Sequence, residues 1–282
     1  FQGQLRCVSW NAQAFFAHDG RRHRDKVNMV RKLAAFHDVI LLSETHSSEG
    51  EVLAWKGIEG FKGFWSHGTC SRAGVGILVS EKLLSVFCAR PSLLEVCPGR
   101  AAILQLRGPQ GGLDIVSVYF PTGTAAELRL SGEIGDAASE PNLRQQRQVL
   151  RSKVQGALQP ASKVLTVIAG DFNWVPRGED RISKTSITDS GHRDAQEEDH
   201  WQSSVCQPSR LHELFQPRFT HDSASARSRL DRAYWNQHVS EQLDRHIRVA
   251  SLEWRLGISL RRAVLFARSS PQRLPESSRP VS

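Results

Sequence analysis

The chain has 282 residues, 39% of them hydrophobic, which is enough to bury a large core in one or two domains. Its 37 Lys and Arg outnumber its 29 Asp and Glu, and the formal charge of +8 favours phosphate-bearing partners, although a basic balance also serves solubility. The five cysteines are odd in number and lack zinc-ligand spacing, so they support neither a disulfide framework nor a zinc finger and favour a reducing compartment. No apolar run is long enough to span a bilayer, and no signal-peptide pattern is present.

Short apolar runs, rich in Val, Ile and Leu and bounded by polar residues or glycine, predict buried strands. Apolar residues that recur at helical spacing predict amphipathic helices, and the second such helix carries Val149, Leu150 and Val154 on one face. In chain order, the predicted elements are a strand at 5–10, a helix at 22–36, strands at 39–42, 74–79, 101–106 and 113–120, a helix at 143–158 and a strand at 164–169.

Strands alternate with helices early in the chain and later follow one another. This order favours an α/β sandwich of mixed sheets over a doubly wound sheet. Residues 177–207 are polar with little periodicity, so we expect a long surface excursion there. From residue 269 onward Ser, Pro and Arg predominate. We therefore expect one domain over 1–268 and a disordered tail or linker over 269–282, within a longer protein because the chain starts at Phe1 rather than Met.

Polar residues that suit phosphodiester chemistry follow several predicted strands, where a sheet would present them together. Glu44 and the amide oxygen of Asn11 could hold a hard cation such as Mg²⁺, with Mn²⁺ as an alternative. That cation would polarise a phosphodiester. Asp171 could accept a proton from the attacking water or orient it, and Asn173 could hydrogen-bond a non-bridging oxygen.

Four ordered motifs carry a family resemblance: Trp10-Asn11, Ser43-Glu44-Thr45, Gly170-Asp171-Phe172-Asn173 and Ser228-Arg229-Leu230-Asp231-Arg232. With Gly74-Val75-Gly76-Ile77 and Phe219-Thr220-His221, the chain resembles the endonuclease/exonuclease/phosphatase superfamily from about residue 5 to about residue 266. Its motifs are most similar to those of the AP-endonuclease-like domains of LINE-type retrotransposons.

The resemblance implies a DNase I-like fold, a four-layer sandwich of two mixed β-sheets flanked by helices. It also implies roles for individual residues. Glu44 resembles the principal metal ligand, with Asn11 nearby, and Asp171 resembles the residue that positions the water. Tyr119 resembles an aromatic hydroxyl that contacts the phosphate, and Asp231 resembles the carboxylate that orients a catalytic histidine.

The closing motif departs from the family, which ends with Ser-Asp-His before its last core strand. Here Leu260 stands at the Asp position and Arg261 at the His position. Arg261 keeps a positive charge near the phosphate and could pair with Asp231, but a guanidinium cannot shuttle protons near neutral pH. The dipeptide Asp199-His200 precedes Asp231, so its order is wrong for a substitute. We therefore expect impaired cleavage.

Structural interpretations stand beside several of these roles. Glu44 could be an ordinary carboxylate at a strand end, and Asp171, Asn173 and Asn11 could simply form turns or caps. Tyr119 could be a half-buried aromatic residue. Asp231 could form a structural salt bridge with Arg229 or Arg232, and Trp174 could either stack on a flipped base or pack locally. The basic run 21–24 could be a solvated helix start or contact phosphate.

Two functions of different class follow. The first is a DNA endonuclease domain of a retrotransposon polyprotein, with DNA as partner, no membrane, nuclear localisation and a reverse transcriptase domain C-terminal to it. The second is a catalytically dead nucleic-acid-binding remnant of the same fold, which the replacement at Leu260 and Arg261 favours. A salt titration of DNA binding, paired with a nicking assay, distinguishes the two.

Overall fold

The structure is a computed structural model that describes residues 5–16, 20–68, 73–109, 111–122, 143–161, 164–184, 195–216, 218–223, 226–236, 248–256 and 259–268, the last two ranges by their backbone. The elements, in chain order, are β1 (Leu5–Asn11), α1 (Gly20–Ala34), β2 (Val39–Ser43), α2 (Glu49–Trp55), β3 (Phe61–Ser66), β4 (Val75–Ser80), α3 (Glu81–Leu84), β5 (Ser92–Cys97), β6 (Ala101–Gly108), β7 (Gly111–Tyr119), α5 (Leu143–Ala157), β8 (Val164–Asp171), the 3-10 turn η1 (Gly178–Asp180), β9 (Arg181–Ser183), α6 (Ala195–Trp201), the π-helix η3 (Gln202–Cys206), α7 (Gln207–Ser209), β10 (His212–Glu213), β11 (His221–Asp222), β12 (Ala226–Ser228), β13 (Asp231–Trp235), β14 (Arg248–Leu256) and β15 (Ser259–Arg268).

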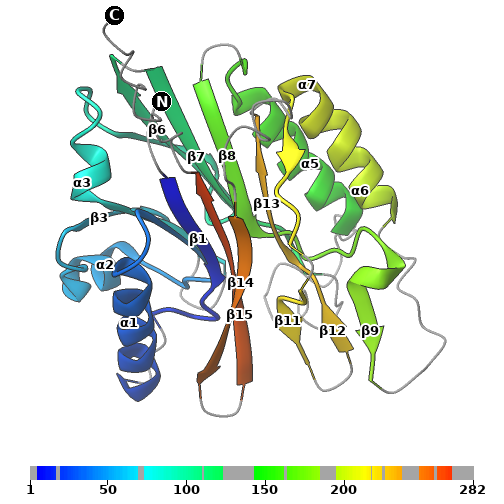
Figure 1. The fold of residues 1–282 in the computed structure, drawn as a ribbon, viewed down its shortest axis with the longest axis horizontal. Helices are drawn as coiled ribbons and strands as arrows, with labels where there is room; N and C mark the ends of the chain where they lie inside the picture. The colour runs from blue at the N-terminus through cyan, green and yellow to red at the C-terminus, as the bar shows by residue number, and fades with distance from the viewer. Residues whose placement is uncertain are drawn as a thin grey trace, which may run out of the picture.

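Two six-stranded sheets form the centre of the fold (Figure 1). The strand order is β14-β15-β1-β2-β4-β3 in the first sheet and β10-β13-β8-β7-β6-β5 in the second. Each sheet is mixed, because β1 pairs with β2 and β7 pairs with β8 in parallel, while the neighbouring pairs run antiparallel. A small sheet of order β11-β12-β9 lies at the edge where β8 ends and β13 begins (Figure 1).

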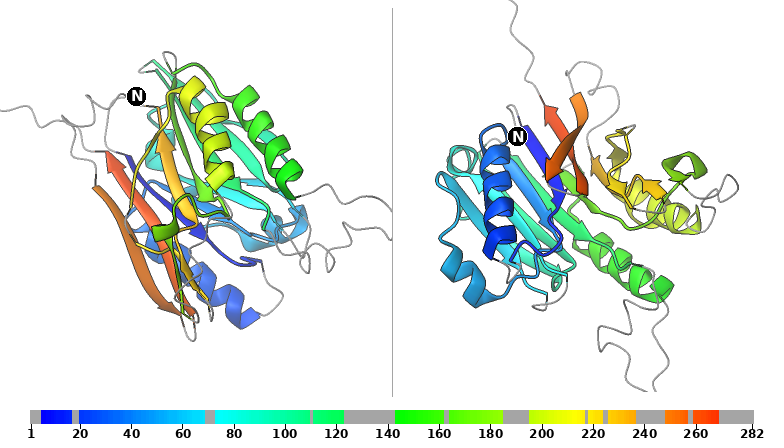
Figure 2. Two further views of the ribbon diagram at one scale, coloured as in Figure 1. Left: turned by 90° about the vertical axis from the view of Figure 1, so that its right-hand side faces the viewer. Right: turned by 90° about the horizontal axis from the view of Figure 1, so that it is seen from below.

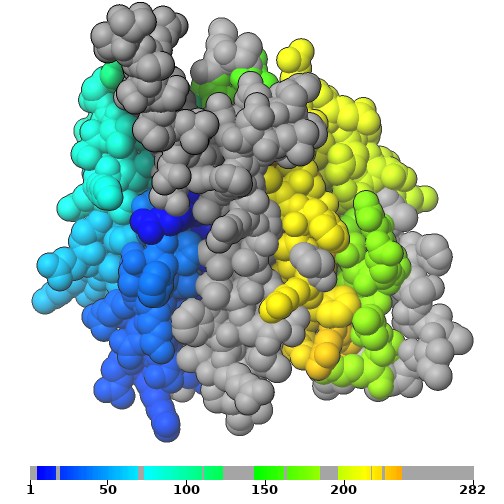
Figure 3. All heavy atoms as spheres, viewed as in Figure 1, coloured from blue at the N-terminus to red at the C-terminus, as the bar shows by residue number. Residues whose placement is uncertain are grey.

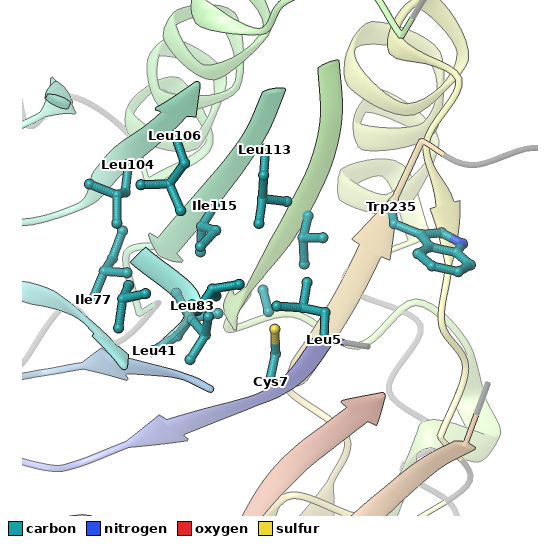
Figure 4. Packing of buried hydrophobic residues seen from close by; sticks show 14 of the residues in the cluster. Leu5, Cys7, Leu41, Ile77, Leu83, Leu104, Leu106, Leu113, Ile115 and Trp235 are labelled. Carbon is teal, nitrogen blue, oxygen red and sulfur yellow. The ribbon is translucent and has the colours of Figure 1, made fainter. Parts of the chain in front are cut away.

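The two sheets pack face to face over an apolar core. Alternate residues of β1, β2 and β4 meet those of β6, β7 and β8, as Figure 4 shows for Cys7, Leu41, Ile77, Leu104 and Ile115. These side chains are fully buried, as expected for strands that are apolar on both faces. The order of apolar residues therefore produces a dry layer between the sheets.

Helices cover the outer face of each sheet, which makes four layers (Figure 2). In the space-filling view of Figure 3, the blue residues near the N-terminus and the yellow residues around position 200 lie on opposite sides of the molecule. α1 packs Val27, Val30 and Leu33 against the first sheet. α5 packs Leu150 and Val154 against the second sheet, together with α6 and η3. The predicted sandwich of two mixed, helix-flanked sheets is confirmed. Within the described ranges, no helix has the length and apolarity needed to cross a membrane.

Several local expectations were wrong. Residues 195–206, predicted as part of an irregular excursion, form α6 and η3. Val149, predicted on the apolar face of α5, is 47% exposed, and Arg147 and Arg151 are buried with Leu150 and Val154 instead. The half-exposed edge strands β3 and β5 were not predicted. The predicted tail at 269–282 lies outside the described residues.

Candidate active site

The candidate residues lie where the parallel strands of both sheets end. Asn11, the last residue of β1, is level with Ser43 of β2, and Glu44 follows at once. In the second sheet, Tyr119 at the end of β7 is level with Asp171 at the end of β8. Because parallel strands end at the same edge, each pair presents its polar residues together.

Asn11 connects the two sheets at this edge. Its side-chain Nδ2 donates to Glu44 Oε1 at 2.9 Å and to Asp171 Oδ2 at 2.8 Å. Its Oδ1 accepts from the backbone N–H of Gln13 at 3.0 Å. Asn11 therefore presents its nitrogen to the carboxylates, whereas the sequence analysis expected its oxygen to face a cation. Asn11 acts here as a bridge between two acidic residues.

A tight turn after β8 fixes Asp171 and Asn173. Asp171 Oδ1 accepts from the backbone N–H of Asn173 at 2.9 Å, and Asn173 has a positive φ of 53°. Asn173 Nδ2 donates to the carbonyl of Phe120 at 2.8 Å. Gly170 is required before this turn, because a Cβ there would lie 1.8 Å from the carbonyl oxygen of Val118. The turn predicted as a structural alternative therefore exists, and it holds the Asp171 carboxylate at the strand end.

The cluster is acidic and desolvated. Burial and the nearby charge of Glu44 raise the pKa of Asp171 to about 6, while hydrogen bonds from Asn11 and Asn173 and the charge of Arg232 oppose that shift. Burial, followed by the charge of Glu44, also raises the pKa of Tyr119. Tyr119 therefore keeps its proton at neutral pH and can donate a hydrogen bond.

Asp231 extends this cluster from β13. It pairs with Asp171 across the sheet and is 3% exposed. Burial, followed by the charge of Asp171, raises its pKa, while a hydrogen bond from Thr220 lowers it. Its backbone N–H donates to Thr220 Oγ1 at 2.9 Å, but Asp231 Oδ1 has no hydrogen-bond partner among the described residues.

The suggested structural salt bridges of Asp231 are not formed in the described part of the chain. Arg229 pairs with Asp180 at 2.7 Å and also with Glu213, whereas Arg232 pairs with Glu198 at 2.9 Å. Both arginines form their ion pairs with other carboxylates, so Asp231 keeps a carboxylate oxygen without a partner among the described residues at the strand-end cluster.

The strand-end cluster, defined as Asn11, Glu44, Tyr119, Asp171 and Asp231, fits a hard divalent cation. The charge of Glu44 raises the pKa of Asp171, the charge of Asp171 raises that of Asp231, and the Oδ1 of Asp231 lacks a partner among the described residues, so a cation would relieve both conditions. In the described ranges, no three His, Cys, Asp or Glu side chains form a ready metal cage. Mg²⁺ does not require one, because one or two carboxylates with substrate oxygens and water suffice.

Trp174 and Arg261 are the two predicted substrate contacts, and neither is a member of this cluster. Trp174 is 0% exposed, its indole N–H donates to Glu198 at 3.1 Å, and its ring lies 4.6 Å from that of Phe120. It packs locally, which corrects the prediction that it contacts substrate. Arg261 lies in β15 opposite Trp254 of β14, and its side chain is outside the described part of the structure. β15 continues the first sheet beside β1 and approaches β11 and β13, so Arg261 belongs to a strand that borders the cluster.

Supporting residues that were not predicted also hold the cluster in place. Arg147 of α5 is buried and donates to the carbonyl oxygens of Asn173 at 2.6 Å and Pro121 at 3.2 Å, which holds both strand ends. The helical spacing of Arg147 with Leu150 and Val154 was the feature of the sequence that could have placed Arg147 on the buried face of α5. Thr220 holds the start of β13, and His221 follows it. Desolvation lowers the pKa of His221, and the charge of Glu44 opposes this.

The sequence profile of the Endonuclease/Exonuclease/phosphatase family matches residues 8–250, the stretch that includes every member of the cluster. The chain belongs to this family. A comparison with curated protein sequences finds no significant match.

Solved structures of endonuclease/exonuclease/phosphatase proteins share the DNase I-like fold. The AP endonuclease LMAP of Leishmania major has a TM-score of 0.66 at 15% identity, covering 95% of this chain and 89% of that one. The 3′ phosphatase NExo from Neisseria has 0.61 at 15%, covering 93% and 98%. The endonuclease domain of TRAS1, a telomere-specific non-LTR retrotransposon, has 0.54 at 16%, covering 95% and 100%.

Proposed function

We propose that this chain is the domain of a metal-dependent phosphodiesterase that nicks DNA, in the context of a retrotransposon polyprotein with a reverse transcriptase. One observation carries the proposal: a single amide, that of Asn11, holds Glu44 of one sheet and Asp171 of the other at the edge where the parallel strands end. Because carboxylates of both sheets bond to the same amide nitrogen, this arrangement supports a common cation site.

The residues of the cluster have separable tasks. Glu44 would hold a Mg²⁺ or Mn²⁺ ion, and the bound cation would neutralise charge on the phosphoryl oxygens. Asp171, with a pKa of about 6, is mostly ionised at neutral pH and can orient a water molecule or accept its proton. Tyr119 keeps its hydroxyl proton and can donate to a phosphate oxygen. Asn173 completes the turn that positions Asp171.

The choice of DNA as substrate has two supports. The chain carries a formal charge of +8, which favours a polyanion. Among structures of similar fold, TDP2 of D. rerio was solved with a single-strand DNA product and NExo from Neisseria with a product DNA hairpin. TRAS1, whose endonuclease domain is also similar, is a retrotransposon protein and supports the proposed context.

We expect the activity to be weak. The family's closing Asp-His pair is replaced by Leu260 and Arg261, so the cluster lacks one carboxylate and an imidazole that Asp231 would orient. An arginine at this position can attract a phosphate but cannot exchange a proton near neutral pH. Removal of one oriented acid or base typically slows a reaction by about 10²–10⁴-fold.

A nicking assay tests the proposal. Supercoiled plasmid is incubated with the purified chain in Mg²⁺ or EDTA, alongside Glu44→Gln, which keeps the size of the side chain and removes its charge. Slow nicking in Mg²⁺ that is absent in EDTA and in Glu44→Gln supports the proposal. Nicking that persists in Glu44→Gln would contradict it. Steeply salt-dependent DNA binding without any nicking favours the non-catalytic binding protein, for which the altered closing motif is the specific observation.

A further inference from the structure

A pocket of about 480 Å³ lies in the outer helical layer of the second sheet. It opens between α5 and the segment formed by α6 and η3, which lie side by side in Figures 1 and 2. One stripe of α5 provides four lining residues, and α6 and η3 provide one each. The six are Arg144, Gln148, Arg151, Ser152, His200 and Ser204.

Every described lining residue can donate a hydrogen bond, and none of these described residues carries a carboxylate. The set consists of two guanidinium groups, a primary amide, two hydroxyls and an imidazole. Such a surface has many donors and a positive charge, which is unfavourable for a cation and poorly matched to an apolar ligand. A ligand with several closely spaced, negatively charged oxygens satisfies these donors best.

Arg151 is a fixed part of this pocket. It is 3% exposed and forms an ion pair with Glu197, which is also buried and does not line the pocket. A second guanidinium nitrogen of Arg151 lies 3.5 Å from His200 Nδ1. The guanidinium is thus held in place before any ligand arrives, so a ligand would not bear the cost of ordering it. Arg144, on the same stripe, is exposed and brings a second guanidinium group to the pocket.

The backbone on the α6 and η3 side of the pocket contains a π-helical turn, a feature that supports a binding role. α6 continues directly into η3, a π-helix of five residues that includes Ser204. π-helical turns are rare and are found frequently at functional sites. The wider turn packs Val205 and Cys206 against the second sheet while Ser204 faces α5 across the pocket. The π-helical turn η3 therefore changes the register between α6 and the following residues at the point where Ser204 lines the pocket.

We propose that this pocket binds a phosphate group, held by the forked donors of Arg144 and Arg151 and by the surrounding hydroxyl and amide groups. The phosphate comes either from a nucleic-acid strand or from free inorganic phosphate. The first source rests on the proposed function, because α5 also holds Asn173 through Arg147, so a strand cut at the cluster would pass close to this helix. The chemistry of the pocket itself does not depend on that function.

Two exposed lining residues provide variants that should fold. Arg144→Gln removes a charge, and Gln148→Glu places a carboxylate among the donors. Lys153→Gln is the matched control, because Lys153 is exposed on the same helix, does not line the pocket and also loses one charge. Melting temperatures of all three should equal that of the parent chain, which confirms that binding changes do not reflect unfolding.

Binding is measured in EDTA, with inorganic phosphate by calorimetry and with a single-stranded oligonucleotide by filter binding across a salt series. The imidazole resonance of His200, identified by its loss in His200→Gln, reports binding inside the pocket. We expect phosphate to shift that resonance. We also expect Arg144→Gln to weaken phosphate binding about fivefold and Gln148→Glu to weaken it further, with less than a twofold change in Lys153→Gln.

The oligonucleotide identifies the source. If the strand occupies the pocket, the slope of log affinity against log salt should become shallower by about 0.7 in Arg144→Gln. Loss of phosphate binding with unchanged oligonucleotide binding assigns free phosphate as the ligand. The proposal is overturned if phosphate leaves His200 unshifted, or if Lys153→Gln weakens binding as much as the pocket variants. A chain that fails to nick DNA but binds phosphate here would refute the proposed function and leave this inference intact.

Discussion

The strand-end cluster and the closing strand β15 border the same edge of the sandwich, yet they differ in what they retain. The cluster keeps its acidic residues, held by hydrogen bonds from Asn11 and by the turn at Asn173. β15 keeps its pairing with β1 but carries Leu260 and Arg261 at the positions that we propose correspond to the family's closing Asp-His pair. On that proposal, a strand preserves its structural role while its chemical role changes, because pairing depends on the backbone and chemistry depends on two side chains.

Restoring the closing motif should produce the largest effect. We expect Leu260→Asp combined with Arg261→His to raise the nicking rate by about 10²–10⁴-fold, because Asp231 would regain an imidazole to orient. The measurement is initial nicking rate under single-turnover conditions. The combination of both substitutions with Glu44→Gln is the control and should be inactive. An unchanged rate in the restored variant would show that the defect lies in the cluster rather than in β15.

Trp174 tests whether the support beneath the cluster is structural. Trp174→Ala should lower the free energy of unfolding by about 3–5 kcal/mol, because it removes a fully buried aromatic side chain. Trp174→Phe should cost less and leave the affinity for DNA unchanged, because the ring makes its contacts inside the protein. Denaturant unfolding and filter binding measure the two quantities. A folded Trp174→Phe variant that binds DNA poorly would show that Trp174 contacts the substrate, contrary to its buried position.

The acidic cluster should make the metal-free protein less stable at higher pH. The folded-state pKa of Asp171, about 6, lies above that of an unfolded aspartate, so its stabilising contribution is complete below about pH 4 and is lost as pH rises through 6. Asp171→Asn should weaken this dependence, part of which the raised pKa of buried Asp231 maintains, and should raise the free energy of unfolding at pH 8 by at most about 3 kcal/mol. Unfolding in EDTA between pH 4 and 8 checks this. A parent chain whose stability rises over that interval would contradict the raised pKa.

A divalent cation should reverse part of that destabilisation. We expect Mg²⁺ at ten times its dissociation constant to stabilise the parent chain by about 1.4 kcal/mol, since only the folded state presents the cluster. Glu44→Gln should gain less. Thermal unfolding at pH 8 with and without Mg²⁺ measures the difference. Equal stabilisation of both proteins would show that the cation binds outside the strand-end cluster. The contrast between an intact cluster and an altered closing strand would then be contradicted.

The central strands and the positions of the cluster residues could be predicted from sequence because buried apolar residues and reactive polar residues are adjacent in the chain. Each parallel strand is a continuous apolar run, and the polar motif begins where the run ends, so the location of Asn11, Glu44 and Asp171 at one edge followed from strand parallelism.

Other features could not be predicted because the same residues are compatible with either a helix or a loop, or with either a buried or an exposed position. The helix at 195–201 was hidden because buried Glu197, half-buried Glu198 and exposed Asp199 and His200 mask the apolar spacing of Trp201 and Val205. Arg147 and Arg151 lie on the buried stripe of α5, where hydropathy alone predicts solvent. Their burial depends on partners distant in the chain, the carbonyl of Asn173 and the carboxylate of Glu197.

The bridge made by Asn11 has a mechanical consequence. The primary amide of Asn11 donates to Glu44 within the first sheet and to Asp171 of the second sheet, so one hydrogen bond joins the two sheets at this edge and is sensitive to their separation. A core substitution that thickens the layer between them, for example at fully buried Cys7 or Leu41, would pull this amide away from one carboxylate. We therefore expect the chemistry of the strand-end cluster to depend on the spacing between the two sheets. Core substitutions that change this spacing should alter that chemistry without contacting the cluster.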